Sequence, residues 1–158
     1  MKTNLEQALD IAKELERRNA TNQMKFYQPY PYQLKFHNDA SSQRLLMAGN
    51  RVGKSFCGAM EIAFHATGKY PDWWQGRKFD RPVRAWVGGV SNETTRDVCQ
   101  KELVGQPDDP HAKGTGSIPL ADIKETVRKP GVPNGLNSLI VKHITGGYSR
   151  IGFKAYEM

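Results

Sequence analysis

Residues 45–56, LLMAGNRVGKSF, limit what this chain can fold into more than any other stretch. The segment finishes in Gly-Lys-Ser, as a phosphate-binding loop does. Ala48 stands where the usual G-x-x-x-x-G-K-[ST] pattern begins with glycine, but Gly49 follows at once and can supply the tight turn. We therefore expect a short buried strand over 44–48, then the loop, then a helix that begins at Lys54.

A loop of this kind binds phosphate because backbone N–H groups and the positive end of the following helix converge on the anion. Lys54 would reach the β- and γ-phosphates, the Ser55 hydroxyl would bind Mg²⁺, and Gly53 would let the backbone approach closely. The predicted nucleotide site comprises Ala48, Gly49, Asn50, Arg51, Val52, Gly53, Lys54 and Ser55. The alternative is a chance Gly-Lys-Ser at a helix start.

Two further residues bear on this site. Gln33 lies in the aromatic segment PYPYQLKF, about 20 residues before the loop. Its amide offers a donor and an acceptor side by side, which complements the N6 and N7 edge of adenine. Arg51, inside the loop, can stabilise charge on a γ-phosphate, or it can bind a structural carboxylate or a DNA phosphate. The alternative to adenine recognition for Gln33 is that it is an ordinary solvated residue of a helix.

The amino-acid composition is typical of a soluble globular protein and says little more about function. The 158 residues suffice for one domain, and the net charge of +7 favours polyanionic partners such as nucleic acid. Two cysteines without a Cys-x-x-Cys pair, and four histidines without ligand spacing, predict no metal site beyond nucleotide-bound Mg²⁺. Cys57 is expected to be buried. The sequence contains no run of 18 apolar residues, so it predicts no membrane-spanning helix.

Local signals predict an alternation of helices and strands, and therefore an α/β layer fold. We expect an amphipathic packing helix over 4–18, started by a capping box between Thr3 and Glu6, and a short helix opened by Pro31. The further elements expected are a helix from 54 ended by Gly68, a strand over 83–90, a helix over 92–104 capped by Ser91, a short helix over 120–128, and a hairpin of 138–144 with 150–156. Trp73 and Trp74 are expected to cover an edge of the core.

Taken together, the segments PYQLKFH, LLMAGNRVGKS, VRAWVGGVSNETTRDVCQKELVG and SLIVKHITGGYSRIGFKAYE resemble the N-terminal ATPase region of tailed-phage terminase large subunits. The resemblance runs from about residue 25 to the end. It implies an α/β fold of the P-loop NTPase (helicase-like, ASCE) type, with residues 1–20 as a separate N-terminal helix and 21–158 as part of the ATPase domain. The departure from glycine at Ala48 and an arginine within the loop are typical of these proteins.

The resemblance also implies a function. Such proteins use ATP hydrolysis to move double-stranded DNA into procapsids in the host-cell cytoplasm, together with a portal protein and a small terminase subunit, as a possible homo-oligomer. Gln33 would contact adenine, Lys54 and Ser55 would hold phosphate and Mg²⁺, and Arg51 would sense or stabilise the γ-phosphate. In several members that arginine stands one position earlier, where this chain has Asn50.

The carboxylates of the family's hydrolytic site are not found in the sequence. The family has an Asp at the end of an apolar strand, followed by a Glu, shortly after the FKAYE segment; none of the acidic residues after Ser55 follows four apolar residues, and the sequence ends at Met158. We therefore expect a region cut before that motif, which binds ATP without hydrolysing it alone, lacks nuclease activity, and is marginally stable or self-associating because its sheet exposes edges.

Two other function classes remain open from the residues alone. A different P-loop enzyme, such as a helicase-like ATPase or a nucleotide kinase, would carry the same loop with other motifs. A degenerate, non-catalytic module would keep the loop as scaffold and bind nucleic acid or a capsid protein.

Overall fold

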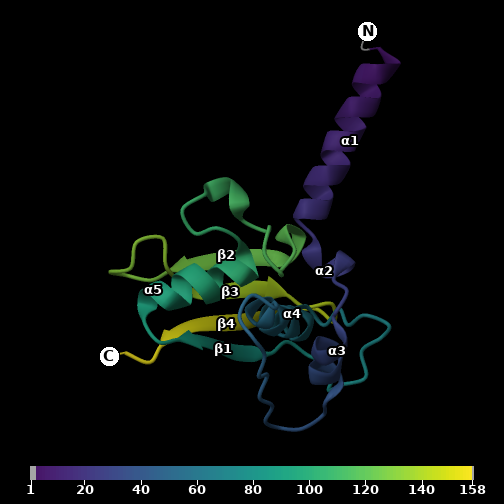
Figure 1. The fold of residues 1–158 in the computed structure, drawn as a ribbon. Helices are drawn as coiled ribbons and strands as arrows, with labels where there is room; N and C mark the ends of the chain where they lie inside the picture. The colour runs from purple at the N-terminus through teal and green to yellow at the C-terminus, as the bar shows by residue number, and fades with distance from the viewer. Residues whose placement is uncertain (1–2, 158) are drawn as a thin grey trace.

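The computed structural model describes residues 3–157, and its centre is a mixed four-stranded sheet (Figure 1). The strand order is β1-β4-β3-β2. β1 runs parallel to β4, whereas β4 with β3 and β3 with β2 are antiparallel. The strands are β1 (Arg84–Gly89), β2 (Ile123–Arg128), β3 (Leu136–Lys142) and β4 (Tyr148–Ala155). The predicted strand over 83–90 and the predicted C-terminal hairpin are confirmed.

Within residues 3–157, four helices precede the first strand in the sequence, and the other helical segments lie between β1 and β2. The α-helices are α1 (Asn4–Ala20), α2 (Gln23–Phe26), α3 (Pro31–Asn38), α4 (Lys54–Thr67), α5 (Asn92–Thr94) and α6 (Lys101–Val104). A π-helical turn, η1 (Thr95–Gln100), joins α5 to α6, and single 3₁₀ turns lie at η2 (Pro110–Ala112) and η3 (Leu120–Asp122). The fold is therefore α/β, as predicted. No helix within the described part of the chain has both the length and the apolar content needed to cross a bilayer.

α4 is the helix that forms the core with the sheet. It ends as predicted at Gly68, whose left-handed backbone (φ 71°) lets its N–H donate to the Phe64 carbonyl at 2.9 Å. Met60 and Phe64 are buried to 1% exposure or less, in one cluster with Ile151 and Phe153 of β4. An apolar face at helical spacing thus covers alternate residues of a strand, and this burial stabilises both elements.

The helical segment after β1 is tied to the ends of two strands. Ser91 caps it as predicted, accepting a hydrogen bond from the Thr94 N–H at 3.1 Å. The Thr95 hydroxyl accepts from the Gly89 N–H at 3.0 Å and donates to the Lys154 carbonyl at 2.8 Å. One buried hydroxyl therefore joins the helical segment to the carboxyl ends of β1 and β4.

Two of the predicted elements are wrong. Residues 44–48 form no strand, and Leu45 and Met47 are 82% and 81% exposed. No strand among residues 3–157 pairs with this segment, so its backbone follows an irregular path. The helix predicted over 120–128 is a 3₁₀ turn followed by β2, because pairing with β3 satisfies the backbone of a segment that includes the β-branched Thr126.

α1 begins as predicted but packs differently. The capping box is present: the Thr3 N–H donates to Glu6 Oε2 at 2.8 Å, and the Glu6 N–H donates to Thr3 Oγ1. The prediction that its apolar face packs against the core is wrong, since Leu5, Leu9 and Leu15 are 81%, 53% and 52% exposed. Figure 1 shows α1 extending away from the sheet, so most of its 17 residues lie beyond reach of the core.

Trp73 and Trp74 cover an edge of the core, as predicted. Trp74 is 3% exposed, and its ring centroid lies 5.4 Å from that of Phe64 in an edge-on arrangement. Its indole N–H donates to the Arg77 carbonyl at 3.0 Å, which satisfies its one polar group. Cys57 is fully buried, also as predicted.

The exposed apolar side chains of α1 and of residues 45–47 predict concentration-dependent self-association. Replacing Leu45 and Met47 by Gln is expected to shift sedimentation-velocity profiles towards the monomer, because the change removes apolar surface without affecting the core. Val90→Gln, at an exposed apolar residue elsewhere, is the matched control and should leave the profile unchanged. A wild-type chain that stays monomeric at high concentration and melts cooperatively at high temperature would contradict this expectation.

Candidate nucleotide-binding site

The loop before α4 contains two residues with left-handed backbone conformation. Gly53 has φ 80° and forms the N-cap of α4, where its carbonyl accepts the first helical hydrogen bond from the Cys57 N–H at 2.9 Å. Arg51 has φ 58°, which is uncommon for a residue that carries a side chain. Two such residues within three positions reverse the chain tightly before the helix begins.

Lys54 folds back onto the start of this loop. Its ammonium donates to the Ala48 carbonyl at 2.8 Å and also to the Gly49 carbonyl. Ser55 follows in the first turn of α4 and is exposed. The first N–H groups of an α-helix have no intrahelical acceptor, and the helix dipole makes this end attractive to anions. The loop, the lysine and the helix start therefore meet in one place, as phosphate binding requires.

α3 is joined to the loop by two hydrogen bonds across about 20 residues of sequence. Gln33, only 2% exposed, donates from Nε2 to the Gly53 carbonyl at 3.3 Å. The Tyr32 hydroxyl donates to the Val52 carbonyl. On its other side, Gln33 Oε1 accepts from the Tyr30 N–H at 2.9 Å. The structure thus brings together the residue predicted to recognise the base and the loop predicted to hold phosphate.

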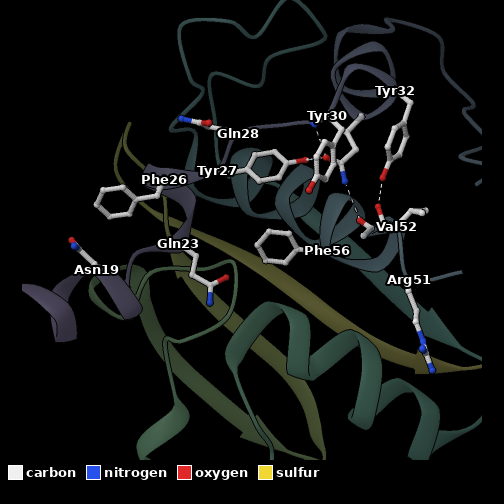
Figure 2. A pocket seen from close by; sticks show the side chains of 12 residues that line it. Asn19, Gln23, Phe26, Tyr27, Gln28, Tyr30, Tyr32, Arg51, Val52 and Phe56 are labelled. Atoms are coloured by element: carbon white, nitrogen blue, oxygen red, sulfur yellow. Dashed lines mark hydrogen bonds between the residues drawn. The ribbon is translucent and has the colours of Figure 1, made fainter.

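A cleft of about 880 Å³ opens beside this junction. Arg51, Val52 and Gly53 line one part of it. The rest is lined by four amide side chains, Asn19, Gln23, Gln28 and Gln33, and by five aromatic side chains, Phe26, Tyr27, Tyr30, Tyr32 and Phe56. Figure 2 shows the rings gathered along the cleft, with the Arg51 side chain directed away from them at the far end. Sequence reasoning did not assign these rings to the site, although the crowding of aromatics over 24–36 was a signal for them.

The Glu61 carboxylate of α4 accepts hydrogen bonds from three side chains. His37 Nδ1 lies 2.6 Å from Oε2, while Arg44 Nη2 and His65 Nε2 lie 2.5 Å and 3.1 Å from Oε1. Glu61 is 6% exposed. Burial opposes its ionisation, but the hydrogen bonds from His37, His65 and Arg44 outweigh burial and lower the pKa of Glu61 from 4.5 to about 2. This carboxylate therefore links α3, the segment before the loop, and α4.

Sequence reasoning missed this role of Glu61. The signal for it was a charged residue within the apolar part of a helix, four residues before His65. Within residues 3–157, no group of three or more His, Cys, Asp or Glu side chains is arranged to hold a metal ion. The contact of Ser55 with Mg²⁺ through a nucleotide stays a prediction.

Comparison with known proteins gives a consistent assignment. A model of the N-terminal region of the T4-like-virus type of terminase large subunit matches residues 45–158. The protein named terminase, large subunit, of Salmonella phage P22 is 36% identical to the chain over 168 aligned residues, which cover 94% of this chain. The chain belongs to the terminase large subunit family. It spans 34% of the length of the P22 relative. No solved structure gave a significant match.

The family model begins at residue 45, so it includes the loop, Lys54 and all of α4 but neither Gln33 nor the aromatic segment. The P22 relative aligns with 94% of the chain, and that alignment extends over Gln33 as well as the loop. The hydrogen bond between Gln33 and Gly53 therefore joins two segments that both align with this relative.

Glycine at position 53 is required by two constraints at once. Its φ is left-handed, and a Cβ there would lie 3.2 Å from Gln33 Nε2. Gly53→Ala is expected to lower the free energy of unfolding by about 1 kcal/mol or more, measured by urea denaturation. Gly58→Ala is the matched control, because Gly58 lies within α4 with no atom near its Cβ position; it should stabilise the chain by about 0.5–1 kcal/mol. Equal effects of the two changes would contradict this reasoning.

Because the pKa of Glu61 is lower in the folded chain than its ordinary value, its contribution to stability is present above about pH 4.5 and is lost as the pH falls towards 2. The free energy of unfolding should fall by about 3 kcal/mol over this range from this group alone. Denaturant titrations at each pH would measure it. Glu61→Gln should flatten the profile, whereas Glu125→Gln, at an exposed carboxylate, should not.

Proposed function

We propose that the chain is the nucleotide-binding part of a phage DNA-packaging ATPase and that it binds Mg-ATP in the cleft between α3 and the loop before α4. The hydrogen bond from Gln33 Nε2 to the Gly53 carbonyl, 3.3 Å long, carries this proposal. It joins the Gln33 amide, which we propose recognises adenine, to the loop that we propose holds the phosphates. A cleft of about 880 Å³ is also of the size that small-molecule sites have.

Each predicted site residue then has a task. Gln33 offers a donor and an acceptor to the N7 and N6 edge of adenine. Lys54, with the backbone N–H groups at the start of α4, holds the β- and γ-phosphates, and Ser55 contributes a hydroxyl to Mg²⁺. Arg51, which lines the same cleft, supplies a positive charge near the phosphates. Bound Mg²⁺ would screen the charge of the phosphate oxygens.

We further propose that the α/β fold is of the P-loop NTPase type. The order of loop and helix α4, followed by a parallel pair of strands, β1 and β4, supports this class. Membership of the terminase large subunit family supports a role in packaging double-stranded DNA in the host cytoplasm, with portal protein and small terminase subunit as partners. The net charge of +7 is suited to a polyanion.

Calorimetric titration of the chain with Mg-ATP tests the nucleotide site. Lys54→Ala should abolish measurable binding, because it removes the charge that faces the phosphates. Lys35→Ala is the matched control: Lys35 lies exposed on α3, the helix that carries Gln33, and its loss changes net charge equally. Affinity that is unchanged by Lys54→Ala, or lowered equally by both changes, would overturn the assignment.

A further inference from the structure

A chain of buried and partly buried hydrogen bonds runs from α4 to Gln33. Glu61 Oε2 lies 2.6 Å from His37 Nδ1, and His37 Nε2 lies 2.9 Å from the Tyr27 hydroxyl. The Tyr27 hydroxyl lies 3.4 Å from Gln33 Oε1. His37 is fully buried, and Tyr27 is half-buried. The hydroxyl has one proton and two neighbouring acceptors, so the direction of its hydrogen bond depends on His37.

The carboxylate determines that direction. Ionised Glu61 can only accept hydrogen bonds, so Nδ1 of His37 carries the ring proton. Nε2 faces the Tyr27 hydroxyl and, at 3.5 Å, the Cys57 thiol. Burial raises the pKa of Tyr27, and it raises the pKa of Cys57 to about 11, so both groups keep a proton that they can donate. With the ring proton on Nδ1, Nε2 is the acceptor, and the Tyr27 hydroxyl, which is the nearer of the two donors, donates to it.

The direction of the Tyr27 hydrogen bond decides which acceptor sites of Gln33 stay free. With the Tyr27 proton given to His37, Gln33 Oε1 accepts from the Tyr30 N–H and keeps one lone pair free. Adenine presents an amino group that can donate to this lone pair, whereas guanine presents a carbonyl oxygen at the same position. We propose that Glu61 is a positioning residue that makes the cleft prefer ATP to GTP, acting through His37 and Tyr27 on Gln33. The proposal rests on the nucleotide function proposed above.

Glu61→Gln should reverse the direction of the hydrogen bonds. Arg44 Nη2, 2.5 Å from Oε1, can only donate, so the amide oxygen of the new side chain stays on that side. The amide NH₂ then faces His37 Nδ1, which must accept, and the ring proton moves to Nε2. His37 now donates to the Tyr27 oxygen, and the Tyr27 proton turns to Gln33 Oε1, where it competes with adenine.

The test compares the ratio of the Kd for GTP to the Kd for ATP, measured by calorimetry on the full chain. Glu61→Gln should lower this ratio about tenfold, the effect of one hydrogen bond. Tyr27→Phe removes the competing proton and gives the reference for a double variant. On that background, Glu61→Gln should change the ratio less than about threefold. An equal loss on both backgrounds would mean that Glu61 is only structural and would overturn the proposal.

A second measurement does not depend on ligand or variant. Nitrogen-15 NMR of the His37 ring in the unliganded wild-type chain should find the proton on Nδ1 and none on Nε2. A proton on Nε2 would overturn the proposal even if Glu61→Gln fails to fold. Binding of inorganic tripolyphosphate distinguishes a failure of the positioning role of Glu61 from a failure of the nucleotide site. A wild-type chain that binds tripolyphosphate and both nucleotides without preferring ATP refutes the positioning role alone, whereas one that binds none of them refutes the nucleotide site itself.

Discussion

The buried carboxylate of Glu61 is the interaction on which the geometry of the cleft depends. It accepts hydrogen bonds from His37 of α3, from Arg44 just before the loop, and from His65 one turn further along α4. A buried charge is stable only when it is paired and hydrogen-bonded, so each of these donors is held in place by the same requirement. The position of α3 against α4 follows, and it lets Gln33 reach the Gly53 carbonyl.

The apolar core supports this polar arrangement from the same helix. Met60 and Phe64 of α4 pack in one cluster with β4, while Phe64 also contacts the rings of His37 and Trp74. A side chain that touches both the sheet and the aromatic edge limits how far α4 can shift relative to either. Packing therefore fixes the position of α4, the helix that carries Glu61. A carboxylate in a fixed position favours one arrangement of the three side chains that donate to it.

Helix ends with a signal in their own residues were predicted correctly, whereas the segment over 44–48 and the packing of α1 depend on distant partners and were not. Thr3, Pro31, Gly68 and Ser91 act within a turn of their own position, and each begins or ends a helix as expected. Residues 44–48 are apolar enough for a buried strand, but a strand also needs a neighbour, which no local pattern reveals. The helical spacing of α1 likewise predicted its fold but not where its apolar face would lie.

The same distinction applies to the site. The loop and Gln33 were found because their chemistry is readable from residue type and spacing, whereas the link through Glu61 joins residues 17 and 24 positions away that share no motif. Since residues 44–48 lie outside the sheet, ladder hydrogen bonds do not position the loop. Arg44 holds its start through Glu61, and Tyr32 and Gln33 hold its end through the Val52 and Gly53 carbonyls. Side-chain hydrogen bonds that involve α3 and α4 thus take the place of a strand, and this makes the polar residues of α3 as important to the loop as its own glycines.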